Sequence, residues 1–152
     1  MSDLYEVIYL STRREGLTDQ VIVDDIVLPS GIKNRHLDIT GCLWFSNERF
    51  LQILEGPREA VEQVYEAIRS DDRHYAIATV STSPVTHRSF ARWGMRALRG
   101  DEQNQIDQLI EYHAPNYHRQ PAKPTAQPDQ PLIEQVRSFL VTLSQADPSP
   151  SL

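Results

Sequence analysis

The hydrophobic pattern divides the first hundred residues into strands and helices. A helical repeat covers Gly16–Lys33, where Val23, Ile26, Val27 and Ser30 share one face, and a second helix starts at Gly56-Pro57. Runs with strand character occupy Leu4–Leu10, Ile39–Phe45, Arg49–Glu55, Ala76–Thr82 and Phe90–Leu98. The predicted order is β-α-β-β-α-β-β. This order is typical of an α+β, ferredoxin-like sheet with two helices on one face and an added strand.

The pattern changes after Gly100, which predicts a boundary between a domain at 1–100 and an extension at 101–152. Asp101–His113 fits a thin amphipathic helix, and Pro115–Pro131 is rich in proline. A stronger amphipathic helix is predicted from Leu132 to Leu143. We expect this helical and proline-rich extension to pack on the sheet or to contact partners.

Composition narrows the class of protein. The 152 residues fit one domain with a core, and no apolar run is long enough for a membrane helix of about 20 residues. The single Cys42 and the absence of a secretory signal predict a cytoplasmic protein with no membrane association. The net charge of -6 opposes direct nucleic-acid binding, and the histidines show no metal-ligand spacing, so we predict no metal.

A polar residue interrupts the apolar stretch FLQILEG. Gln52 shares a strand face with Phe50 and Leu54, and burying an unpaired amide costs about 1–3 kcal/mol. Tyr9 ends the first strand on an inward face, while Ser30 and Asn34 continue the inward stripe of the first helix. Each residue alone could be a hydrogen-bonded core residue. Four converging polar groups favour a ligand slot with apolar walls.

Several motifs identify the region from Leu4 to Leu98 as a member of the BLUF family, flavin-binding blue-light sensors of bacteria. They are LYEVIYLS, the N-R-H-L-D-ITG stretch near residue 40, RFLQILEGP, SDDRHY and RSFARWGM. The resemblance implies that FAD, or FMN, lies between the two helices. It assigns flavin contacts to Tyr9, Ser30, Asn34, Gln52, Asp71, Arg73 and His74, and signalling to Trp93 and Met95. Alternation along the fifth strand predicts that Trp93 and Met95 share a face.

The resemblance also implies a photochemical mechanism. The excited flavin takes an electron and a proton from Tyr9, and both return after Gln52 has changed its hydrogen bonds by rotation or tautomerisation. The new hydrogen-bond pattern shifts flavin absorption to the red. Three positions depart from the family: Gly94 stands where serine is common, Ala67 where many relatives are basic, and Pro29 is unexpected. Gly94 is expected to loosen its strand.

The leading hypothesis is a photoreceptor that is not an enzyme. It signals to a partner protein of unknown identity or to another copy in a homo-oligomer. Switching of Gln52 is expected to repack Trp93 and Met95 and to alter the docking of Asp101–Leu143; the alternative is a static cover. Two other functions remain open: a flavin-free regulatory or interaction module, and an acyl-phosphate hydrolase using the STRREG loop as an anion cradle.

Overall fold

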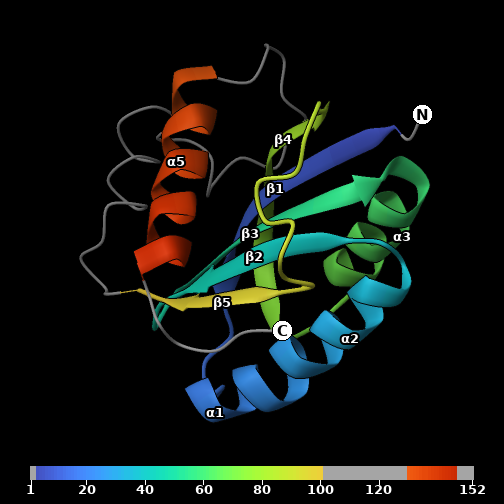
Figure 1. Cartoon of the computed structure of the whole chain (residues 1–152). Coiled ribbons are helices and arrows are strands. Elements are labelled where there is room, and N and C mark those ends of the chain that lie inside the picture. The colour runs from blue at the N-terminus through green and yellow to red at the C-terminus, as the bar shows by residue number, and fades with distance from the viewer. Residues whose placement is uncertain (1–2, 101–129, 147–152) are drawn as a thin grey trace.

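A computed structural model describes residues 3–100 and 130–146 (Figure 1). The strands are β1 (Leu4–Arg13), β2 (Thr40–Phe45), β3 (Arg49–Pro57), β4 (His74–Pro84) and β5 (Arg96–Arg99). The helices are α1 (Asp19–Ile22), the π-helical η1 (Val23–Val27), α2 (Leu28–His36), α3 (Arg58–Arg69) and α5 (Gln130–Ala146). The predicted α+β architecture is confirmed.

The five strands form one sheet in the order β4-β1-β3-β2-β5. β1 lies between β3 and β4 and is antiparallel to both, whereas β5 is parallel to β2. The β1–β3 register places Tyr9 directly opposite Gln52. This pairing brings together two residues that are 43 positions apart in the chain.

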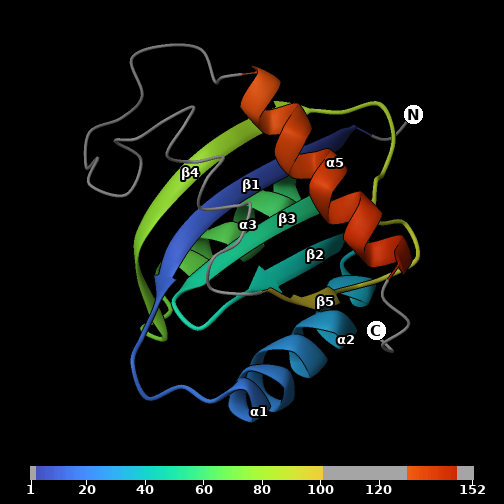
Figure 2. The same ribbon diagram turned by 90° about the vertical axis from the view of Figure 1, so that its left-hand side faces the viewer.

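Helices cover both faces of the sheet (Figure 2). α1, η1, α2 and α3 lie on one face, and α5 lies on the other. The period of two in β1 separates the two cores as the sequence predicts: Val7 and Tyr9 belong to the α2–α3 side, and Ile8 and Leu10 to the α5 side. The amphipathic face of α5 contributes Val136 and Leu140 to its core.

The first helical region departs from a regular α-helix. It runs from Asp19 to His36 rather than from Gly16 to Lys33, and Thr18 caps its start by accepting from the Val21 N–H. Its middle is π-helical, with the Leu28 N–H donating to the Val23 carbonyl five residues back. Pro29 is the second residue of α2, two positions beyond this segment, and has no N–H to donate. A proline at this position therefore favours a local change of helical pitch.

The fifth strand is shorter than predicted. Residues 90–95 form bends and turns, and β5 starts only at Arg96. In the C-terminal part, the helix predicted from Leu132 to Leu143 is confirmed within α5. The predictions for Asp101–His113 and for the proline-rich segment up to residue 129 lie outside the described residues.

Candidate functional site

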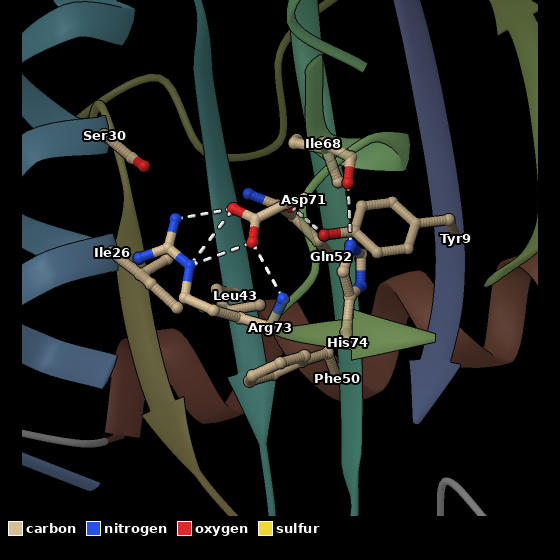
Figure 3. A pocket seen from close by; sticks show the side chains of 10 residues that line it. All are labelled: Tyr9, Ile26, Ser30, Leu43, Phe50, Gln52, Ile68, Asp71, Arg73 and His74. Atoms are coloured by element: carbon tan, nitrogen blue, oxygen red, sulfur yellow. Dashed lines mark hydrogen bonds and ion pairs between the residues drawn. The ribbon is translucent and has the colours of Figure 1, made fainter. Parts of the chain in front are cut away.

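A cleft opens between the sheet and the helices on the α2–α3 side (Figure 3). One lobe, of about 460 Å³, is lined by Tyr9, Ile26, Ser30, Leu43, Phe50, Gln52, Ile68, Asp71, Arg73 and His74. The adjoining lobe, of about 560 Å³, shares Ser30, Gln52, Ile68 and Asp71 and adds Lys33, Asn34, Leu54, Val64, Ala67 and Met95. Apolar walls with a few polar groups are typical of small-molecule sites.

Gln52 lies at the centre of a buried chain of hydrogen bonds. The Tyr9 hydroxyl donates to Gln52 Oε1, and Gln52 Nε2 donates to the Met95 Sδ at 3.4 Å. Tyr9 and Gln52 are 3% and 5% exposed. An amide has an acceptor and two donors, so Gln52 keeps further hydrogen-bonding capacity toward the cleft. Tyr9 and Gln52, which were both predicted to line a ligand slot, are thus hydrogen-bonded to each other in the structure.

The Tyr9 phenol is held in its neutral form. Burial raises the pKa of Tyr9 far above its ordinary value, and the nearby Tyr65 and Asp71 raise it further. The Tyr65 ring packs against Tyr9 with centroids 5.4 Å apart. Tyr9 is therefore a hydrogen-bond donor at neutral pH.

Asn34 and Ser30 lie on α2 and line the cleft. Asn34 is 2% exposed, and its Nδ2 donates to the Gly94 carbonyl at 3.0 Å. Its side chain therefore joins α2 to the segment before β5. The structure brings both residues to the cleft wall predicted for them.

Asp71 and Arg73 precede β4, His74 is its first residue, and all three line the cleft. Arg73 forms an ion pair with Asp71 at 2.5 Å, and the Arg73 guanidinium lowers the pKa of that carboxyl. His74 Nε2 lies 2.7 Å from the Ile68 carbonyl, which can only accept, so Nε2 carries a hydrogen. Its Nδ1 lies 2.7 Å from the Ser11 hydroxyl, so His74 offers the cleft its ring rather than a nitrogen.

The prediction that Trp93 and Met95 share a face is wrong. Met95 is buried in the α2–α3 core beside Gln52, whereas Trp93 packs against the core under α5. The alternation rule does not apply because residues 90–95 are not a strand. The two side chains therefore reach opposite sides of the sheet.

The structure shows a reason for the glycine at position 94, whereas the loosening of its segment stays a prediction. An added Cβ at Gly94 would lie 2.4 Å from the Gly31 carbonyl oxygen, so the glycine permits close contact with α2. Three successive carbonyls are held there. Arg35 donates to the Arg92 carbonyl, the Gly41 N–H to Trp93 and the Asn34 amide to Gly94.

Sequence reasoning missed two buried charged residues next to this segment. Glu55 is fully buried and accepts from the N–H groups of Ser89 and Phe90. Arg96 is 1% exposed, lies 5.2 Å from the Trp93 ring and donates to the Ser144 carbonyl near the end of α5. Strand alternation is the signal that could have placed both side chains on the α5 side. Their partners could not be predicted, because these partners are distant in sequence.

Arg13 does not form an anion cradle. Its guanidinium donates to the carbonyls of Ser46 and Leu17 and pairs with Asp19 at 3.0 Å. These contacts fix the loop that follows β1. They do not favour the acyl-phosphate hydrolase hypothesis.

The cleft residues fit a flavin. Its flat ring needs apolar walls, which Ile26, Leu43 and Ile68 provide, and its polar edge needs amide and hydroxyl partners such as Gln52 and Asn34. Comparison with known proteins decides the family. Residues 4–96 match the profile "BLUF: Sensors of blue-light using FAD". The chain belongs to the BLUF family. BLUF domains bind FAD or FMN, and this chain is a flavin-binding blue-light photoreceptor.

Two curated relatives and one solved structure are similar to this BLUF chain. It is 34% identical over 90 residues to the blue light- and temperature-regulated antirepressor BluF of Escherichia coli (strain K12), covering 58% of this chain and 22% of the relative. It is 42% identical over 62 residues to the photoactivated adenylate cyclase subunit beta of Euglena longa, covering 40% and 7%. The solved structure titled "BlsA photo-activated state" aligns with a TM-score of 0.71 and 27% identity, covering 97% of this chain and 99% of that one.

The chain thus spans less than a quarter of the length of these two curated relatives. Within residues 3–100 and 130–146, no helix is long and apolar enough to cross a membrane. The same residues contain no group of three or more histidine, cysteine or acidic side chains that could hold a metal ion.

Proposed function

We propose that this BLUF protein signals through reversal of the Gln52 amide and has no catalytic activity of its own. The hydrogen-bond chain from Tyr9 through Gln52 to Met95 carries the proposal. We assign flavin contacts to Tyr9, Ser30, Asn34, Gln52, Asp71 and Arg73, with His74 contributing its ring. FAD is the proposed cofactor, and FMN is the alternative.

Tyr9 and Gln52 perform the first step. When bound, the flavin absorbs blue light and supplies an electron acceptor. Loss of an electron would make the Tyr9 phenol strongly acidic, so its proton would follow the electron to the bound flavin, and Gln52 Oε1 would lose the hydrogen bond that it accepts in the structure. The return of the electron and the proton restores Tyr9. During this interval the amide can turn about its terminal bond, which exchanges its oxygen and its nitrogen.

Reversal of the amide removes the partner of Met95. Gln52 Nε2 would then donate to the Tyr9 oxygen, and Oε1 would face the Met95 sulfur. A thioether has no hydrogen to donate, so an acceptor would face an acceptor. Met95 is therefore expected to move away from Gln52, and the tightly held segment before β5 to move with it.

The route continues to α5 through Arg96. Arg96 follows Met95 in the chain, its guanidinium lies 5.2 Å from the Trp93 ring, and its Nη2 donates to the Ser144 carbonyl at 3.1 Å. α5 is also held by Arg137, which pairs with the buried Glu6 of β1 at 2.6 Å. A change in Met95 can thus alter the docking of α5. Such a shift needs only a few kcal/mol between two packings.

The output is proposed to be protein contact. We divide the chain into a sensor at residues 1–100 and an extension at 101–152 that passes the change to a partner or to a second copy. An antirepressor among the relatives supports signalling to another protein. We also propose that the protein is cytoplasmic.

One light experiment with two variants tests the photochemistry. The purified protein should bind flavin, and blue light should shift its absorption reversibly to the red. Tyr9→Phe and Gln52→Leu should both retain flavin, because the apolar contacts remain, and both should lose the shift. A normal shift in either variant would show that this residue is not part of the switch.

A further inference from the structure

Pro29 interrupts the hydrogen bonds of the first helical region at the edge of the cleft. In an α-helix, the N–H of residue 29 would donate to the Asp25 carbonyl, but proline has no N–H. The proline ring also clashes with the carbonyl four residues back. The preceding π-helical η1 is consistent with this local disturbance. The Asp25 carbonyl therefore lacks its ordinary α-helical donor.

Arg73 donates to that carbonyl from the other side of the cleft. Its Nη1 lies 3.2 Å from the Asp25 oxygen. The same guanidinium holds Asp71 through Nε at 2.9 Å and Nη2 at 2.5 Å. Figure 3 shows the Arg73 side chain extending next to Ile26, with its guanidinium facing Asp71. One side chain thus joins η1 to the turn before β4.

The joined elements are walls of the cofactor cleft. Ile26 and Ser30 line it from the helical side, and Asp71 and Arg73 line it from the β4 side. Separation of these walls would widen the cleft. The Arg73–Asp25 contact therefore opposes release of a flat ligand.

We infer that Pro29 is a positioning residue for flavin retention: by leaving the Asp25 carbonyl available, it lets Arg73 tie the two walls of the cleft together. This inference rests on the proposed placement of flavin in the cleft. It gives a physical role to a proline that looks out of place in a helix. Pro29 acts through Arg73 and needs no contact of its own with the cofactor.

Flavin release from four proteins tests the coupling: wild type, Pro29→Ala, Arg73→Ala and the double variant. The rate is followed by the rise in FAD fluorescence after dilution. Pro29→Ala creates an N–H that competes with Arg73 for the Asp25 carbonyl, so release should speed up about three- to tenfold. In the Arg73→Ala background, the same substitution should change the rate by less than about twofold. Pro84→Ala, at the end of β4 and away from the cleft lining, is the matched control and should resemble wild type.

Two outcomes would overturn the inference: wild-type release from Pro29→Ala, or an equal acceleration by Pro29→Ala in both backgrounds. The second outcome would assign the effect to helix shape alone. Nuclear magnetic resonance of the flavin-free protein gives an independent readout. In Pro29→Ala, the new amide at position 29 should be protected from exchange, and the Arg73 guanidinium signals should shift. An unprotected amide with unshifted Arg73 signals refutes the inference, whereas failure to bind any flavin refutes only the proposed function.

Discussion

A buried glutamine is useful in this core because its amide is directional. Gln52 accepts from a hydroxyl on one side and donates to a sulfur on the other. Tyr9 can exchange donor and acceptor roles, but the Met95 thioether cannot donate. The two amide orientations therefore differ in their contact with Met95. In the proposed mechanism, that difference gives the signal a defined direction at the scale of single atoms.

The Asp71–Arg73 pair predicts a pH-dependent contribution to stability. Arg73 lowers the pKa of Asp71, so the pair stabilises the folded state above the ordinary aspartate pKa of about 3.9. The contribution should be lost as the pH falls from that value through the lower folded-state pKa. Asp71→Asn should reduce the free energy of unfolding by about 0.5–1 kcal/mol at neutral pH, because the pair is partly exposed.

Chemical denaturation of wild type and Asp71→Asn from neutral pH down to about pH 3 measures this effect. The difference between the two proteins should be constant near neutrality and should shrink below about pH 4. Asp72→Asn makes the same charge change on the exposed neighbouring residue and should cause little change at any pH. A difference that grows with acid would contradict the assigned pairing.

At this scale, the sequence predicted the residues of the cleft better than their partners. Tyr9 and Gln52 could be placed because strand alternation fixes the face on which each side chain lies. The Met95 contact depends on the backbone path of residues 90–95, which has no periodic pattern. The Arg73–Asp25 contact could not be predicted, because its acceptor is a backbone carbonyl and every residue carries one.

The segment before β5 behaves as an element without regular secondary structure. Glu55 holds its start through two N–H groups, and α2 holds its end at Gly94. Burial raises the pKa of Glu55, and hydrogen bonds from Ser89, Phe90 and Thr40 oppose that rise. These contacts hold the segment at both ends, so in the proposed mechanism it passes on a displacement of Met95.

Gly94→Ser tests the close contact between this segment and α2. The new Cβ would meet the Gly31 carbonyl oxygen at 2.4 Å, so the segment must move away from the helix. We expect a loss of about 1–3 kcal/mol in the free energy of unfolding, measured by chemical denaturation. Gly94→Ala should cost a similar amount, because the Cβ rather than the hydroxyl causes the clash. Unchanged stability in both variants would contradict the contact.

Element-level prediction succeeded where the side-chain period was clear, although α3 starts at Arg58 and the predicted start, Gly56-Pro57, lies in β3. β1, β3 and α3 follow their patterns, although β1 and β3 extend past the predicted ends. The π-helical segment was not predictable, because a proline within a helical pattern can end, kink or widen a helix. The length of β5 was overestimated. Its predicted start, Phe90, is buried in a bend where the N–H groups of Ser89 and Phe90 donate to the Glu55 carboxylate.

On the scale of the whole molecule, the sheet separates the cleft side from the α5 side. Two arginines cross the interface with α5 in opposite directions: Arg137 reaches from α5 to Glu6, and Arg96 reaches from β5 to Ser144. Breaking a buried ion pair is costly, so α5 is held in a defined position. The segment at 90–95 connects the two sides, with Met95 on one and Trp93 on the other.

Hydrogen exchange in the dark and in blue light tests the central claim that Gln52 moves α5 through Met95. In the wild type, light should change protection across residues 89–99 and 130–146. Met95→Leu preserves a similar apolar volume and removes the sulfur acceptor, so it should keep the red shift and lose most of the change across 130–146. Unchanged protection of both segments in a wild-type protein with an intact red shift would contradict the account, as would a full α5 response in Met95→Leu.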